Sequence, residues 1–279
     1  MHTIDVDDWE KFEHELNKAR QSEISSGRNA EFLYRGLSDS SWQLTTTLER
    51  RGRERMPYSP YYYHISAVKP QVESFTGIKW SVRDFPKVDQ ALRENDGPSF
   101  SQFPEPEEYS YMVHLRHHGF PSPLLDWTRS EFIAAYFAFR PDATPAEGKV
   151  AIYLFSDQPE FHKSTHEGQP QIHRTGPYVT THRRHFLQQS DYTMSVGFDS
   201  QWYFAKHEEV FARSDPHQNF LWKFTIPWTE RLKVLKLLDT YNLNAFSLFD
   251  SEETLMETMA LRELDFHPVG TRFARNWQR

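Results

Sequence analysis

The fold is decided by residues 117–139, which read HHGFPSPLLDWTRSEFIAAYFAF. Two prolines precede Leu124-Leu125, so this part of the stretch predicts a turn that leads into a short strand. The segment Thr128-Arg-Ser-Glu131 has the spacing of a capping box, which predicts a helix with Thr128 as its N-cap. Residues 132–139 are apolar on every face, so we expect this helix to be buried on most sides.

The flanking sequence predicts a mixture of helices and strands. Asp7 or Asp8 is the expected N-cap of the first helix. The other predicted elements are, in chain order, a helix over 5–20, a strand over 32–35, a helix over 104–118 that ends at Gly119, a central strand over 149–155, strands over 185–193 and 220–226, and helices that begin at Pro227 and Asp250. Because helices and strands do not alternate regularly, the predicted fold class is α+β.

We expect the chain to have one continuous core. An N-terminal helix occupies 1–30, the core covers 31–226, and a helical segment over 227–279 packs on that core. Within the core, residues 50–104 show no steady hydrophobic period. This segment is predicted to be an irregular insertion with some helix, either a lid over a site or a decoration without a function.

Composition limits the classes of function. The chain has 279 residues, of which 38% are hydrophobic and 25% charged, as in globular proteins. It contains no cysteine, which excludes disulfides, thiolate catalysis and Cys-ligated metals. The formal net charge of −7 disfavours general binding to nucleic acid. The N-terminus is acidic and no stretch approaches the ~18 apolar residues of a membrane span, so we expect a cytoplasmic protein without a membrane partner.

A polar site is expected where Arg35 and Asp126 follow predicted strands. Arg35 stands beside Gly36, where the backbone can approach a ligand closely, and a guanidinium can hold a phosphate or carboxylate through paired hydrogen bonds. A helix beginning at Thr128 would add amide donors for the same anion. Each of these residues also has a purely structural interpretation. Asp126 would form an ion pair with Arg35 or Arg129, Thr128 would be only a helix cap, and Trp127 would be only a core side chain.

The combination of motifs resembles the FRG-domain family. It consists of Tyr34-Arg35-Gly36, Ser38-Asp-Ser-Ser-Trp42, His117-His118-Gly119-Phe-Pro, Leu124-Leu-Asp126-Trp127-Thr128 and Ala134-Ala-Tyr-Phe-Ala138. The joint pattern covers about 31–155, and a match from Arg184 to Gln188-Gln189 extends it toward 195. The family takes its name from the aromatic-Arg-Gly element, which has tyrosine here. Because the family is mostly described without an assigned activity, the resemblance implies a fold more than a reaction.

A second resemblance is to ADP-ribosyltransferases. In that fold an aromatic-Arg strand holds the NAD pyrophosphate, a second strand leads into an Ala/Phe-rich helix, and a later strand presents a catalytic Glu. Tyr34-Arg35-Gly36 is similar to the first element, and Asp126-Trp127-Thr128 is similar to the second. Before the strand expected to end near Thr193 there is no Gln/Glu-x-Glu, so transfer would need Asp126 or a downstream Glu instead. The resemblance implies a mixed, split sheet with surrounding helices and an insertion, and NAD as a candidate substrate.

The predicted function is binding of, or action on, a nucleotide-type ligand, by NAD-dependent ADP-ribosyl transfer or by hydrolysis of NAD or a nucleotide. In the predicted site, Arg35 and Gly36 bind phosphate, and Asp126 and Thr128 position ribose or a catalytic water. Trp127 or Tyr34 contacts the base, and Arg184 and Gln188 make further contacts with the ligand. His117 or His118 acts as a general base.

Two other classes of function remain open. The first is a non-catalytic module that binds a ligand or a protein target. The second, less favoured, is a metal-dependent hydrolase, because His114 and His118 lie at i and i+4 with Asp126 as a conceivable third ligand. That motif lacks the Glu of a metalloprotease, so no metal is expected. The sequence also has no Walker, Rossmann or Gly-x-Ser-x-Gly pattern.

Overall fold

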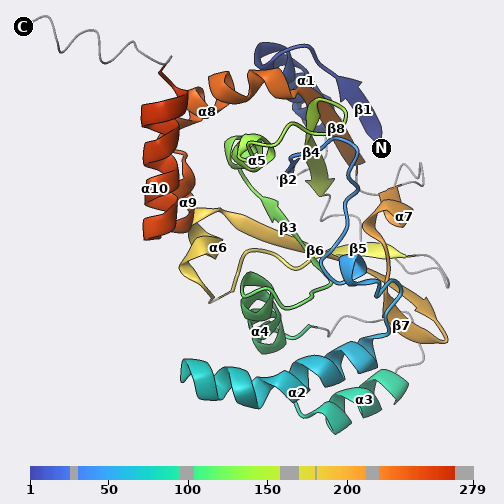
Figure 1. Cartoon of the computed structure of the whole chain (residues 1–279). Helices are drawn as coiled ribbons and strands as arrows, with labels where there is room; N and C mark the ends of the chain where they lie inside the picture. The colour runs from blue at the N-terminus through green and yellow to red at the C-terminus, as the bar shows by residue number, and fades with distance from the viewer. Residues whose placement is uncertain (26–30, 95–103, 158–169, 180, 212–219, 268–279) are drawn as a thin grey trace, which may run out of the picture.

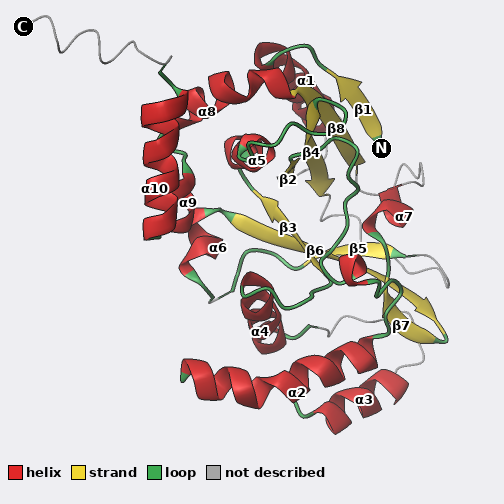
Figure 2. Cartoon of the chain, viewed as in Figure 1, coloured by secondary structure: helices red, strands yellow, loops and turns green. Residues whose placement is uncertain are grey.

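A computed structural model describes residues 1–25, 31–94, 104–157, 170–179, 181–211 and 220–267. Its strands are β1 (His2–Asp5), β2 (Glu31–Leu37), β3 (Leu124–Thr128), β4 (Lys149–Asp157), β5 (Gln171–Arg174), β6 (Ser190–Asp199), β7 (Gln201–Phe204) and β8 (Phe220–Pro227). They form one sheet in the order β1-β8-β4-β2-β3-β6-β5, and β7 pairs with β6. All these pairs are antiparallel except β1 with β8. A mixed sheet with many helices confirms the α+β class (Figures 1 and 2).

The sheet is narrowly joined between β2 and β3. β2 pairs with β4 along its whole length, whereas among the described residues one register pair, Tyr34 with Thr128, joins β2 to β3. On its other edge, β3 pairs with β6 at all five of its residues. Because β2 and β3 separate on either side of that one pair, the side chain of Arg35 can reach across to β3.

The helices divide into two groups that cover different halves of the sheet. They are α1 (Trp9–Ser25), α2 (Tyr58–Thr76), α3 (Phe85–Glu94), α4 (Pro106–His117), α5 (Glu131–Phe139), α6 (Arg183–Leu187), α7 (His207–Phe211), α8 (Arg231–Thr240), α9 (Ala245–Phe249) and α10 (Glu252–Ala260). α1, α5 and α8 pack with β2, β4 and β8, while α2, α3 and α4 pack with β6 and β7 (Figure 1). A third apolar cluster, which includes Leu33, Leu125 and Trp127, lies on the opposite face of the strands.

The helix α5 is buried as expected, but its start differs from the prediction. Six of its nine residues are buried, and it packs directly on β2. Its N-cap is Ser130, whose hydroxyl accepts from the amide of Ile133 at 3.4 Å, and Thr128 is still part of β3. The predicted cap at Thr128 is therefore wrong. Thr128 pairs in the sheet, so its backbone is extended and the helix begins two residues later.

The helix α4 also follows its predicted pattern. Glu105 and Glu108 form a reciprocal capping box at its start, and Gly119 lies just beyond its end with a φ of +86°. The segment 50–104, predicted to be irregular, contains the long helix α2 and the helix α3. The helix α2 buries Tyr58, Tyr61 and Tyr62 against α4 and the β6–β7 hairpin. These aromatic side chains anchor the segment although its sequence has no steady hydrophobic period.

Two other predictions are corrected. The first helix starts at Trp9 and not at residue 5, because His2–Asp5 pairs with β8; Asp8 accepts from the amide of Lys11 at 2.7 Å, as a cap would. The strand predicted from residue 185 starts at Ser190, after the short helix α6. The strands over 149–155 and 220–226 and the helices near Pro227 and Asp250 are present within a few residues. Within the described ranges, none of the helices has the length and apolar character that a membrane crossing needs.

Candidate functional site

The predicted convergence of Arg35 and Asp126 is present in the fold. Nη1 of Arg35 donates to the carbonyl oxygen of Asp126 at 2.6 Å and lies 3.6 Å from its Oδ2. The narrow junction between β2 and β3 makes this contact possible, because Arg35 has no register partner on β3. The side chain of Arg35 is 14% exposed, while that of Asp126 is 40% exposed. The carboxylate therefore lies at the boundary between the protein and solvent.

A second arginine binds the same carboxylate. Nη2 of Arg116, in the last turn of α4, donates to Oδ2 of Asp126 at 2.5 Å, and its side chain is 15% exposed. Sequence reasoning missed Arg116. The available signal was its position ten residues before Asp126, in a helix that turns back at Gly119 and leads directly into β3.

The charges of this cluster favour an anion. Burial lowers the pKa of Arg35, and the nearby positive charges of Arg116 and Arg50 act in the same direction, although Asp126 opposes them. Burial would raise the pKa of Asp126, but Arg116 and Arg35 outweigh burial and lower it below its ordinary value. Two guanidinium groups thus share one carboxylate, which leaves an excess positive charge in an acidic protein.

Within the part of the chain that the structure describes, three polar atoms of the cluster have no hydrogen-bond partner. They are Nε of Arg35, Nε of Arg116 and Oδ1 of Asp126, each with almost no solvent-accessible surface. Buried polar atoms in proteins are normally hydrogen-bonded, so each unpaired atom calls for an explanation. Two free N–H donors and one free acceptor around a single carboxylate are the chemical groups that a phosphate with an adjacent hydroxyl would use.

His117 lies on the same side of β3. Its Nε2 is 2.9 Å from the hydroxyl of Tyr192, and Tyr192 is the register partner of Asp126 on β6. Burial lowers the pKa of His117 to about 4, with Asp126 acting in the opposite direction. The imidazole is therefore neutral at pH 7 and can accept a proton. His118 is exposed at the end of α4 and its ring lies 4.5 Å from that of His114.

The comparison with protein families identifies this region. A profile of the FRG domain matches residues 30–147. The chain contains an FRG domain. The match includes Arg35, Arg116, His117 and Asp126, so the whole charged cluster belongs to the FRG domain, whereas Tyr192 lies beyond it. The comparisons with curated proteins and with solved structures found no match.

Two of the residues predicted to bind ligand are instead packed inside the FRG domain. The hydroxyl of Tyr34 accepts from Nε of Arg20 at 2.6 Å, and its ring belongs to the cluster that includes α1 and α5. A Cβ at Gly36 would lie 1.9 Å from the carbonyl oxygen of Ala134. The absence of a side chain at Gly36 is thus explained by the close approach of α5.

Trp127 and Thr128 are also held by the protein. Nε1 of Trp127 donates to the hydroxyl of Thr193 at 2.7 Å, and its ring lies 5.4 Å from that of Phe155. The hydroxyl of Thr128 donates to the carbonyl oxygen of Gln188 at 2.8 Å. These contacts leave both side chains buried, 3% and 5% exposed by residue, so a ligand would reach them only after a rearrangement.

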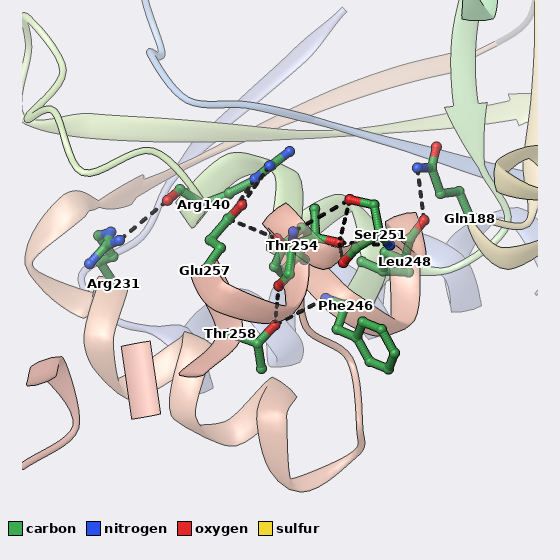
Figure 3. A network of polar contacts seen from close by, with 10 residues as sticks. Arg140, Gln188, Arg231, Phe246, Leu248, Ser251, Thr254, Glu257 and Thr258 are labelled. Atoms are coloured by element: carbon green, nitrogen blue, oxygen red, sulfur yellow. Dashed lines mark hydrogen bonds and ion pairs between the residues drawn. The ribbon is translucent and has the colours of Figure 1, made fainter. Parts of the chain in front are cut away.

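The remaining two predicted residues, Arg184 and Gln188, lie towards the C-terminal helices. Nε2 of Gln188 donates to the carbonyl oxygen of Leu248 at 3.1 Å, and the guanidinium of Arg184 lies over the ring of Phe249. Figure 3 shows the hydrogen bond of Gln188 with Leu248 and, in the same network, the ion pair of Arg140 with Glu257. These polar contacts hold the C-terminal helices against α5 and α6, at a different place from the Arg35 cluster.

A cavity of about 540 Å³ lies next to the histidines. Its lining includes His182, His185, Phe186 and Ser190, from α6 and the residues that flank it, and Arg129, which follows β3. The rings of His182 and His185 lie 6.3 and 6.4 Å from the ring of His117, so the cavity begins beside the charged cluster. Phe186 is 81% exposed and belongs to the cavity wall.

The structure also places a carboxylate where the sequence suggested none. β6 begins at Ser190, so Asp191 is its second residue and is the register partner of Trp127. Asp191 is fully buried, and its Oδ2 accepts from Nη2 of Arg174 at 2.7 Å. Sequence reasoning missed this carboxylate because it placed the start of the strand five residues too early. Among the described residues, no group of three or more His, Asp or Glu side chains has an arrangement that could hold a metal ion.

Proposed function

We propose that the FRG domain binds a phosphate-bearing nucleotide through Arg35 and Arg116. The observation that carries the proposal is the pair of mostly buried guanidinium groups around one partly exposed carboxylate, each with a buried Nε–H that has no partner among the described residues. Arginine binds phosphate well because its planar group donates two parallel hydrogen bonds. A phosphate between the two Nε atoms would supply the partner that both lack and would neutralise the excess positive charge.

A nucleotide suits the surroundings better than free phosphate. The cavity beside His182 and His185 offers space for a planar ring, and Phe186 provides an exposed aromatic surface in its wall. Oδ1 of Asp126 remains available to accept from a ribose hydroxyl. Phosphate, hydroxyl and ring would then each have a complementary group on the protein.

The proposed reaction, if the ligand is NAD or a nucleotide, is ADP-ribosyl transfer or hydrolysis. The two strands that resemble elements of ADP-ribosyltransferases, β2 and β3, are adjacent in the sheet, and β6 follows β3. His117 is neutral at pH 7 and can serve as the general base. Asp191 supplies a carboxylate near the start of β6, in a Gln-Ser-Asp sequence.

A non-catalytic binding module is the second candidate. Both carboxylates of this region are already paired with arginine: the partly exposed Asp126 with Arg116 and Arg35, and the buried Asp191 with Arg174. A carboxylate held by arginine stabilises an oxocarbenium-like ribose less well than a free one. This observation favours a protein that senses a nucleotide without cleaving it.

The test is calorimetric titration of the protein with ADP-ribose, NAD and AMP. Replacing Arg35 or Arg116 by Lys keeps the charge but removes the planar fork, so we expect the binding free energy to weaken by about 1–3 kcal/mol. Arg140→Lys is the control, because Arg140 makes a similar two-point contact with Glu257 in the C-terminal network. Equal affinities in all three variants, or no binding of any of these ligands by the unaltered protein, would refute the proposal. Release of nicotinamide from bound NAD separates the enzyme from the sensor.

A further inference from the structure

A chain of hydrogen bonds runs behind His117 and ends on a backbone carbonyl. Nε2 of His185 is 3.0 Å from the carbonyl oxygen of Pro177, and Nδ1 of His185 is 3.4 Å from the hydroxyl of Tyr192. The same hydroxyl is 2.9 Å from Nε2 of His117. The rings of His185 and Tyr192 are stacked, with an angle of 12° between their planes. His185 and Tyr192 are both buried.

The carbonyl of Pro177 determines which atom carries each proton in this chain of hydrogen bonds. A carbonyl oxygen only accepts, so Nε2 of the neutral His185 carries the proton and its Nδ1 carries a lone pair. That lone pair faces Tyr192, which must donate to it, since the opposite arrangement would leave two acceptors facing each other in a buried place. The single hydroxyl proton of Tyr192 is then committed to His185.

The hydroxyl oxygen of Tyr192 determines which ring nitrogen of His117 carries the proton. With its proton directed at His185, this oxygen accepts from Nε2–H of His117. Nδ1 of His117 makes no hydrogen bond within the described residues and must carry the lone pair.

We propose that Tyr192 and His185 are positioning residues that hold His117 as the Nε2–H tautomer, so that its Nδ1 accepts a hydrogen bond from a hydroxyl group of the ligand. This inference rests on the proposed function for the identity of the ligand, but the tautomer itself is a property of the free protein. It also distinguishes the two neighbouring histidines. His117 has a fixed tautomer, whereas His118 is exposed and contacts the rings of His114 and His182.

The experiment records the ring nitrogens of ¹⁵N-labelled protein by long-range ¹H–¹⁵N NMR at pH 7.5, without ligand. His117→Gln identifies the signals of His117. We expect the unaltered protein to show His117 protonated at Nε2 alone. Tyr192→Phe removes the acceptor, so His117 should shift to a mixture of tautomers. His185→Leu frees the Tyr192 proton, which should then point at His117 and reverse the tautomer to Nδ1–H.

Tyr111→Phe is the matched control, because Tyr111 lies on the same helix as His117 and donates its buried hydroxyl to Ile65 instead. His117 should keep its tautomer in that variant. A His117 protonated at Nδ1 in the unaltered protein, or the same pattern in Tyr192→Phe as in the unaltered protein, would overturn the inference. The Tyr192→Phe result decides the matter if His185→Leu does not fold.

Addition of ADP-ribose then tests the role in the site. We expect the Nδ1 resonance of His117 to shift when ADP-ribose binds. In Arg35→Lys, which binds ADP-ribose more weakly, the resonance should not shift at a ligand concentration that leaves this variant unoccupied. A ligand that binds without moving this resonance would contradict the role of Nδ1 while leaving the phosphate site intact. Failure of ADP-ribose to bind at all would contradict the proposed function and leave the tautomer unaffected, so the two failures are distinguishable.

Discussion

Asp126 is the residue on which the charged cluster depends, because it neutralises two guanidinium groups. Removing its charge by Asp126→Asn leaves Arg35 and Arg116 repelling each other with little access to water. Loss of one partner from a fully buried ion pair costs about 3–5 kcal/mol, but the carboxylate is 40% exposed, so we expect a loss of about 1–2 kcal/mol. Urea unfolding of the ligand-free variant measures this loss.

Added inorganic phosphate should restore part of that stability, because an anion can replace the missing carboxylate charge. Asp142→Asn is the control: Asp142 pairs with Arg231 and is 87% exposed, so neither the substitution nor phosphate should change the unfolding free energy much. A phosphate effect of the same size in both variants would show that the anion acts on the protein generally and not at this cluster.

The helix α5 is buried on most sides, as its apolar sequence predicts. Its amides at Ala134–Phe137 should exchange with solvent only when the whole protein unfolds, because both neighbours, β2 and α8, cover the helix. Helix α3, whose one buried residue is Val88, should exchange faster through local opening. Hydrogen-exchange mass spectrometry checks both. Exchange in α5 as fast as in α3 would contradict the packing.

The elements that could be predicted are those with a strong local signal. The helices α4 and α5 and the strand β4 have capping residues or long apolar runs, and they occur where the sequence places them. β1 could not be predicted, because four residues pair with a strand more than two hundred residues away. The start of β6 was predicted five residues too early and α6 was not predicted, since His185 and Leu187 are equally compatible with a strand and the turn at Gln189 has a positive φ without glycine.

The site shows the same division between local and non-local information. The pairing of Arg35 with Asp126 was predictable because both were expected at the ends of strands and occur in recognisable motifs. Arg116 and Tyr192 were missed, because their contribution depends on how α4 and β6 approach β3. The glycine at position 36 indicates that another group comes close to the backbone there. The sequence alone could not distinguish close packing against a helix from close approach of a ligand.

For the whole molecule, the buried histidines predict that the protein loses stability as the pH falls. Burial lowers the pKa of His117 to about 4 and that of His207 to about 3, and it also lowers those of His114 and His185. The unfolded chain has histidine pKa values of about 6.5 and binds protons that the folded protein does not bind between these limits. The unfolding free energy should therefore fall from pH 6.5 towards pH 4 and be nearly constant above pH 7.5.

Urea unfolding at pH 7.5, 6 and 5 measures this dependence. His117→Gln should make the slope shallower, because one of the groups that takes up a proton only on unfolding is then absent. Asp126, whose pKa is lowered by its arginines, should add a further loss at more acidic pH. An unfolding free energy that stays constant or rises between pH 7.5 and pH 5 would contradict the burial of these histidines.

In the proposed nucleotide site, Arg35 and Arg116 together hold one phosphate. A crystal structure of the protein with ADP-ribose tests this arrangement. We expect phosphate oxygens at about 3 Å from Nε of Arg35 and from Nε of Arg116. Phosphates bound elsewhere, with both of these nitrogens still lacking a partner, would contradict it.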